Sequence, residues 1–413
     1  MASTPSLPIR RNTALLSGSL AMNSATLQLA AAVASLTLVR VLDIDGLLGL
    51  GPAITLGSGA LAALPAGLLM DRFGRVPVLA GGFAGGATGC ALAALGSTQG
   101  WTWAVLLGLV LVGTSTATGL LARAAAGDMY PPERRARGIA LVLFGSVFGA
   151  ILGPAVFSPL LAGRELDGDA LGTLWLAAGV FMLAGMAIVL TVRPDPKRIA
   201  ELLATHAGEP GADAAPGTRI RDLVRRPGVI PALIAAQASF AVMVAVMTLT
   251  GAVVVDHHHH AASHVFAIIG AHVIGMFGLI VVVGDLVDRV GRTPALAGGL
   301  LLMAASTISL LWITGVAASA VALFALGLGW NFSFVAATAV LSDSTAPHER
   351  GKLLGFNDLL AGLTGAGLAL IGGLALTALG VAALAIGGAA LVAAPALWIV
   401  RSDPARAAAR AAA

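Results

Sequence analysis

Two pairs of side chains in the second half of the sequence could together bind a soft metal ion. Met243 and Met247 lie four residues apart in one apolar segment, and His272 and Met276 lie four residues apart in the next. On a helix this spacing brings both members of a pair to one face. Thioether sulfur and imidazole nitrogen are ligands that suit Cu(I). The pattern therefore indicates a Cu(I) site, provided that the two segments are neighbouring helices.

A histidine-rich stretch separates the two pairs. It begins at Asp256 and contains the histidines His257, His258, His259, His260 and His264. Such a tract is typical of metal binding, and here it could capture an ion and pass it to the sulfur atoms. Two alternatives stay open, namely a pH-sensitive gate, because histidine titrates near neutrality, and an inert polar turn.

Composition fixes the class of protein that must position these residues. Of the 413 residues, 58% are hydrophobic and 11% are charged, and the mean hydropathy is +0.93, far above that of soluble domains. The first apolar segment follows Arg10 and Arg11 without an obvious cleavage site, which favours a spanning helix over a removed signal peptide. The single cysteine, Cys90, excludes an internal disulfide framework. We expect an all-α polytopic membrane protein.

Apolar runs long enough to cross a bilayer occur twelve times. The predicted spans are residues 13–37, 47–70, 76–96, 101–125, 138–162, 171–192, 229–255, 264–284, 295–314, 317–341, 353–377 and 380–400. The polar stretch 193–228 divides them six and six. The predicted organisation is thus an N-terminal six-helix half (1–192), a cytoplasmic linker (193–228) and a C-terminal six-helix half (229–413).

The basic residues predict the orientation of these spans. With the N-terminus inside, all but two of the 24 Lys and Arg residues fall on the cytoplasmic side, and the exceptions are Arg40 and Arg164. Both termini are then cytoplasmic, and the histidine tract lies on the outer face. The sequence pI near 10.2 accordingly reflects topology, and no nucleic-acid partner is expected.

One motif occurs once in each half. Gly67-Leu-Leu-Met-Asp71-Arg72-Phe-Gly-Arg75 follows the second span, and Gly284-Asp-Leu-Val-Asp288-Arg289-Val-Gly-Arg292 follows the eighth. This repeat indicates a duplicated six-helix unit. It resembles the signature loop of the major facilitator superfamily, which implies that superfamily's fold across the whole chain. The expected role is gating at the cytoplasmic side, with Gly67 and Gly284 allowing close helix approach and the charged residues forming contacts that break during transport. The gating candidates are Asp71, Arg72, Arg75, Asp288, Arg289 and Arg292.

The two soft pairs fall near the middle of spans seven and eight. A histidine at that depth is costly unless it faces a cavity or a partner, so it is a functional candidate. Methionine carries no such cost, and Met182 and Met186 show the same spacing without a polar companion. The combination of pairs resembles the motifs of the CcoA-like copper importers, a bacterial facilitator family. That resemblance implies copper ligation by Met243, Met247, His272 and Met276, although relatives with this signature carry other cargo, including riboflavin.

These observations predict a transporter of the bacterial inner membrane that imports copper, as Cu(I) or Cu(II), by alternating access. Copper is its substrate, no cofactor is expected, and no constellation of an enzyme is visible. The expected partners are the copper ion and membrane lipid, a copper chaperone is left open, and a monomer is favoured. One alternative is a proton-coupled facilitator of a small organic molecule, riboflavin-like or a drug. Another is a non-transporting metal or pH sensor.

Overall fold

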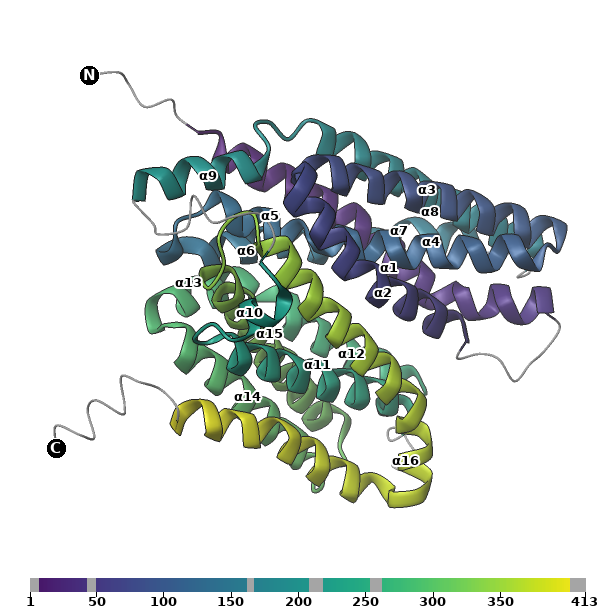
Figure 1. Cartoon of the computed structure of the whole chain (residues 1–413). Coiled ribbons are helices and arrows are strands. Elements are labelled where there is room, and N and C mark those ends of the chain that lie inside the picture. Colours follow the sequence, from purple (N-terminus) through teal and green to yellow (C-terminus); the bar gives the residue numbers. More distant parts are fainter. Residues whose placement is uncertain (1–6, 43–49, 162–166, 208–217, 253–261, 402–413) are drawn as a thin grey trace. The chain divides into compact units, whose positions relative to one another are not determined.

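The computed structural model describes residues 7–42, 50–161, 167–207, 218–252 and 262–401 (Figure 1). Within these ranges every regular element is helical and no strand occurs. Among the described residues, eight helices are long and apolar enough to cross a membrane, and a ninth span is obtained if the bent pair Ile268–Gly278 and Ile280–Val290 is counted as one. The all-α, multi-pass architecture that composition predicts is therefore confirmed.

The chain divides into two compact units. Unit 1 comprises residues 1–220 together with 345–362, and unit 2 comprises residues 221–344 together with 363–413. A short segment from the second half of the sequence, the one that begins the long helix α16 (Arg350–Arg401), thus belongs to unit 1. The predicted division into two six-helix halves at 192 and 228 stays a prediction.

Unit 1 is a helical bundle, drawn from purple through blue to teal in Figure 1, with the start of α16 in yellow-green. Its elements are α1 (Ile9–Leu42), α2 (Leu50–Phe73), α3 (Arg75–Gln99), α4 (Thr102–Leu120), α5 (Ala122–Met129), η2 (Pro132–Arg134), α6 (Arg135–Leu143), α7 (Gly145–Leu161), α8 (Gly168–Leu190), α9 (Pro196–Ala207) and the start of α16. Helix α3 packs along α4 and α8, while α1 packs along α7 and α8. Part of the predicted linker is therefore the ordered helix α9, which lies on α3 and α5.

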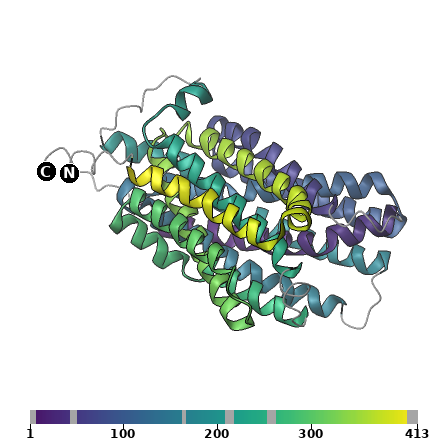
Figure 2. The ribbon, with the colours of Figure 1, turned by 90° about the horizontal axis from the view of Figure 1, so that it is seen from below.

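Unit 2 is built around α15. Its elements are α10 (Ile220–Val224), which begins at the boundary, α11 (Val229–Ala252), α12 (Ala262–Val273), η4 (Ile274–Gly278), α13 (Ile280–Val290), α14 (Arg292–Ser309), α15 (Val316–Asp343) and the remainder of α16. Helix α15 contacts α11, α12, η4, α13 and α14, so most functional candidates of this unit adjoin it. The C-terminal part of α16, yellow in Figures 1 and 2, lies beside α14, and Gly388 approaches Thr307 there.

Helical segments occupy most of the described part of each of the twelve predicted spans, and the single element α16 runs through the last two with a non-helical backbone at Gly380. The main difference lies at the repeated motif, where a loop was expected. Helix α2 continues through Asp71 and Arg72 to Phe73, and a single glycine, Gly74, separates it from α3. Gly291 separates α13 from α14 in the same way, and both glycines have φ of 99°, a conformation that glycine adopts without strain. An i, i+4 ion pair, Asp71–Arg75 or Asp288–Arg292, bridges each break.

Candidate functional site

The four soft ligand candidates lie in unit 2, on elements that contact one another. Met243 and Met247 are half-buried on α11, and His272 is fully buried near the end of α12. Met247 packs against a small apolar cluster formed by Ile268 and Leu323. Helix α11 contacts α12, and both helices contact α15, so the two soft pairs lie on neighbouring elements of unit 2.

The imidazole of His272 is held on one side only. Its Nδ1 lies 2.9 Å from the carbonyl oxygen of Leu323 on α15. That oxygen can only accept, so the Nδ1 atom carries the proton and Nε2 of the neutral ring is left as an acceptor. Nε2 is buried and has no hydrogen-bond partner among the described residues. A ring fixed through Nδ1–H to a backbone carbonyl, with Nε2 free, is the usual arrangement of a metal-binding histidine.

The backbone changes its winding at the same place. Residues Ile274–Gly278, which include Met276, form a π-helical turn, and the span bends by 47° between Gly278 and Ile280. Gly275 lets this turn approach α15 closely, since a Cβ there would overlap the carbonyl oxygen of Phe324. π-turns are rare and occur often at functional sites, and broken helices line the substrate sites of many transporters. Met276 is therefore presented from a widened, interrupted helix.

The structure does not describe the outer histidine tract. His257 to His260 lie outside the described residues, and His264 lies in α12 without a described side chain. In the part of the chain that is described, no three His, Cys, Asp or Glu side chains are grouped as a metal site. The capture role of the tract stays a prediction.

Helix α15 adds polar and aromatic groups to the same neighbourhood. The ring of Trp330 stacks on Phe334 with centroids 4.6 Å apart and meets the edge of Phe277 at 6.0 Å. Trp330 Nε1, both amide atoms of Asn331 and the hydroxyl of Ser333 are buried without a hydrogen-bond partner among the described residues. Unpaired buried groups cost free energy, so this face of α15 offers both stacking and hydrogen bonding to a ligand.

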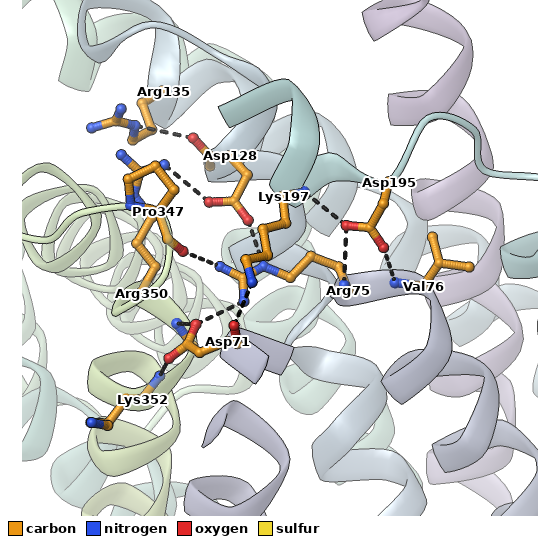
Figure 3. A network of polar contacts seen from close by, with 12 residues as sticks. Asp71, Arg75, Val76, Asp128, Arg135, Asp195, Lys197, Pro347, Arg350 and Lys352 are labelled. Atoms are coloured by element: carbon orange, nitrogen blue, oxygen red, sulfur yellow. Dashed lines mark hydrogen bonds and ion pairs between the residues drawn. The ribbon is translucent and has the colours of Figure 1, made fainter. Parts of the chain in front are cut away.

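The repeated motif of unit 1 forms a buried ion network (Figure 3). Arg75 is fully buried, and its guanidinium contacts Asp128 at 2.6 Å, Asp71 at 2.8 Å and the Pro347 carbonyl oxygen at 2.6 Å. Arg350 donates to the other oxygen of Asp128 at 3.0 Å. The charge of Arg75 is thus shared between two carboxylates, and the network joins α2, α3 and α5 to the start of α16.

Two carboxylates of this region also cap three helices. Asp71 accepts the backbone N–H groups of Gly351 (2.9 Å) and Lys352 (2.6 Å) in the first turn of α16. Asp195 accepts those of Arg75 (3.1 Å) and Val76 (2.9 Å) at the start of α3, and that of Lys197 (2.8 Å) at the start of α9. The first N–H groups of a helix have no partner within the helix, and its N-terminus is the positive end of the helix dipole. The two carboxylates accept hydrogen bonds from these N–H groups and place a negative charge beside the positive ends. Lys197 Nζ donates in turn to the Asp71 carbonyl oxygen at 2.6 Å.

Unit 2 contains a looser version of the same triad. Arg292 contacts Asp288 at 2.5 Å and Asp343 at 3.2 Å, and the three side chains are 16%, 9% and 28% exposed. The corresponding Arg75, Asp71 and Asp128 are 0%, 8% and 0% exposed. Of the six gating candidates, Asp71, Arg75, Asp288 and Arg292 belong to the two triads, whereas Arg72 and Arg289 are exposed and lie outside them. The gating role itself stays a prediction.

Sequence reasoning missed Asp195, Lys197 and the Pro347 carbonyl as members of the network. It also did not identify Asp128 and Arg350 as partners of the motif. A second buried pair, Arg123 with Asp358 at 2.5 Å, was also not predicted. The only signal was the Pro-Asp-Pro run at 194–196, which is typical of a helix start.

The long apolar helices, the duplicated ion triad and the interrupted span define a multi-pass membrane carrier. The sequence matches the family model described as Major Facilitator Superfamily over residues 14–366 and 252–413, and the chain belongs to that superfamily. It is 32% identical over 356 residues to an uncharacterized MFS-type transporter, YdeG of Bacillus subtilis, covering 81% of this chain and 78% of that one.

Another relative carries a named substrate. The riboflavin transporter RfnT of Brucella anthropi is 32% identical over 309 residues, covering 73% of each chain. Among solved structures, the proton:xylose symporter XylE bound to 6-bromo-6-deoxy-D-glucose aligns with a TM-score of 0.80 at 16% identity, over 96% of both chains. That likeness confirms the fold.

Proposed function

We propose that the protein transports copper across the membrane and that unit 2 supplies the binding site. The observation that carries this proposal is the imidazole of His272, fixed through Nδ1 to the Leu323 carbonyl oxygen and left with a buried, unpartnered Nε2. A neutral Nε2 in a dry environment is a good ligand for Cu(I). Met276, one turn further on, and the Met243–Met247 pair on α11 would complete a soft ligand set.

The ligand types suit a carrier better than a storage site. Thioether and neutral imidazole bring no negative charge, so an empty site leaves no buried anion when the ion departs. Weak, neutral ligands also exchange readily, whereas a set of thiolates would retain the ion. Import by alternating access would require the set to separate in one state, and the interrupted span at Met276 is the element that we assign to this change.

We assign a gating role to the ion network of unit 1. The start of α16 is held there by Asp71 through its N–H groups and by Asp128 through Arg350. Loss of these contacts would release a segment that continues directly into unit 2. The network is thus suited to stabilise one conformational state of the transport cycle.

Uptake of radioactive copper into proteoliposomes tests the proposal. The sharpest variant is His272→Asn, because the asparagine amide can still donate to the Leu323 carbonyl oxygen while Nε2 is removed. Metal-site variants of this kind commonly lose about tenfold or more, and we expect at least that loss for His272→Asn and for Met243→Leu. The matched control is Met186→Leu, a methionine of α8 with the same i, i+4 spacing. Equal copper uptake in all four proteins, or none in the parent, would refute the proposal.

A small organic substrate is the second candidate, and the groups on α15 favour it. A flat, polar-edged molecule could stack on Trp330 and hydrogen-bond to Asn331, and a relative that covers 73% of this chain is a riboflavin transporter. Uptake of labelled riboflavin would then fall in Asn331→Leu and stay unchanged in Met243→Leu. The opposite pattern for copper separates the two substrates. A sensor without transport activity would bind copper and show no flux in either assay.

A further inference from the structure

A basic pocket opens in unit 1 beside the repeated motif. The cavity has a volume of about 520 Å³ and lies between the end of α2, the end of α8 and the start of α9. Four cations line it, namely Arg72, Arg193, Lys197 and Arg198. Its volume falls within the range of small-molecule binding pockets.

Three of these cations have unused hydrogen-bonding capacity. The guanidinium groups of Arg72, Arg193 and Arg198 make no hydrogen bond or ion pair with any part of the chain that the structure describes, and Arg72 only overlies the ring of Phe73 at 5.1 Å. Guanidinium groups match the geometry of phosphate oxygens and bind them in a bidentate manner. An ordered pocket with several unpaired guanidiniums is therefore suited to a phosphate ester.

The two carboxylates of the pocket do not neutralise it. Asp195 already accepts three backbone N–H groups at the starts of α3 and α9, which compensate its charge. Glu201 is the other carboxylate, and it has a partner of its own. Four cations against two carboxylates leave the pocket with a formal excess of positive charge.

The surroundings indicate where the phosphate ester comes from. The pocket lies where the apolar helices α2 and α8 end and α3 begins, and the ends of membrane-spanning helices are expected near the lipid headgroups. Two large apolar side chains that line the pocket are exposed, Phe73 at 58% and Leu190 at 48%, and we call them its apolar rim. Cations beside an exposed apolar rim match a ligand with an anionic head and acyl chains.

We propose that this pocket binds the anionic headgroup of a phospholipid, such as phosphatidylglycerol, in the leaflet that the distribution of basic residues predicts to be cytoplasmic. The guanidiniums of Arg72, Arg193 and Arg198 bind the phosphate, and the acyl chains lie along the apolar rim. Lys197 joins the pocket to the carbonyl oxygen of Asp71. We therefore expect a lipid bound in the pocket to stabilise the ion network through Lys197.

Native mass spectrometry of the intact protein measures this binding directly. The parent is titrated with phosphatidylglycerol and, separately, with phosphatidylcholine. The test variant is Arg193→Gln/Arg198→Gln, and the control is Arg134→Gln/Arg225→Gln, two exposed arginines outside the pocket. Both variants lose the same charge, so general attraction to anionic lipid is matched. From the usual contribution of a basic residue near a membrane surface, we expect affinity to fall about 5-fold per arginine and roughly 25-fold in the test variant.

Three outcomes overturn the proposal. The first is equal affinity of the parent for the two lipids, and the second is an equal loss of phosphatidylglycerol affinity in the test and control variants. The third is displacement of phosphatidylglycerol by millimolar inorganic phosphate, which would identify a site for soluble anions. If the double variant does not fold, Arg193→Gln alone replaces it, with an expected loss of about 5-fold. None of these measurements depends on the transported substrate, so they stand apart from the copper assay.

Discussion

Replacing Asp71 by asparagine should destabilise the protein far more than the same replacement of Asp288, its counterpart in the repeat. Asp71 pairs with a fully buried arginine, Arg75, at 2.8 Å and accepts the N–H groups of Gly351 and Lys352. The asparagine side chain would keep one acceptor oxygen but lose the charge that strengthens all three contacts. Asp288 pairs with Arg292, whose side chain is 16% exposed.

The geometry sets the expected size of the difference. Removing one partner of a buried ion pair typically costs about 3–5 kcal/mol. Arg75 keeps Asp128 at 2.6 Å and the Pro347 carbonyl oxygen at 2.6 Å, so its charge is not left alone and the lower end applies. We expect a cost of about 3 kcal/mol for Asp71→Asn. The Asp288 and Arg292 side chains are 9% and 16% exposed, so partial contact with solvent weakens this pair relative to Asp71–Arg75, and we expect a smaller cost of about 1 kcal/mol.

Thermal unfolding in one detergent, followed by tryptophan fluorescence, measures both variants. The expected costs correspond to a fall in Tm of roughly 5 °C for Asp71→Asn and under roughly 2 °C for Asp288→Asn. A single scan rate is required because large proteins often unfold irreversibly. A double-mutant cycle of Asp71→Asn with Arg75→Gln should show non-additive effects. Equal falls in Tm for the two aspartate variants, or additive effects in the cycle, would refute the reasoning.

Two further substitutions test the packing of unit 1. Gly67→Ala would place a Cβ against the backbone carbonyl oxygen of Gly351, so the helices must shift at a cost of roughly 1–3 kcal/mol. The control is Gly81→Ala, whose new Cβ would meet nothing within 4 Å and which should be neutral or slightly stabilising. The same melting assay compares them, and equal Tm values would contradict the close approach. Trp175→Phe replaces a fully buried indole by a smaller ring and removes its 3.1 Å hydrogen bond to Thr37, so the cavity and the lost bond together should cost about 2–3 kcal/mol. An unchanged Tm would show that neither the packing of the indole nor this bond contributes.

Most of the fold could be predicted from the sequence because its determinants are local. Hydropathy over about twenty residues places each span, and the repeat around Asp71 and Asp288 reveals the duplication. The same local reasoning ended α2 three residues too early. Asp71 and Arg72 are polar and suggest a loop. However, Asp71 pairs with Arg75 on the other side of the break, so α2 continues past Asp71 and a single glycine forms the turn.

The partners of the site could not be predicted, because they are distant in the sequence. Asp128 and Arg350 are 222 residues apart, and Asp195 lies in a stretch whose composition indicates a linker. No periodicity reports such pairings. The π-turn at Ile274–Gly278 was equally invisible, since its residues fit an ordinary α-helical pattern. Fixed spacing places His272 and Met276 on one face only if the helix between them is regular.

The strongest argument for a site in unit 2 therefore comes from His272 and not from the methionines. Met182 has the same i, i+4 spacing to Met186, and its sulfur accepts a hydrogen bond from Ser115 at 3.4 Å within an ordinary helix, so spacing alone has no functional meaning. At His272 a buried unpartnered Nε2, a π-turn and a 47° bend occur within a few residues. Each carries a cost in free energy, and folded proteins retain such costs mainly where function requires them. Met276 and the α11 methionines become ligand candidates because they adjoin this place.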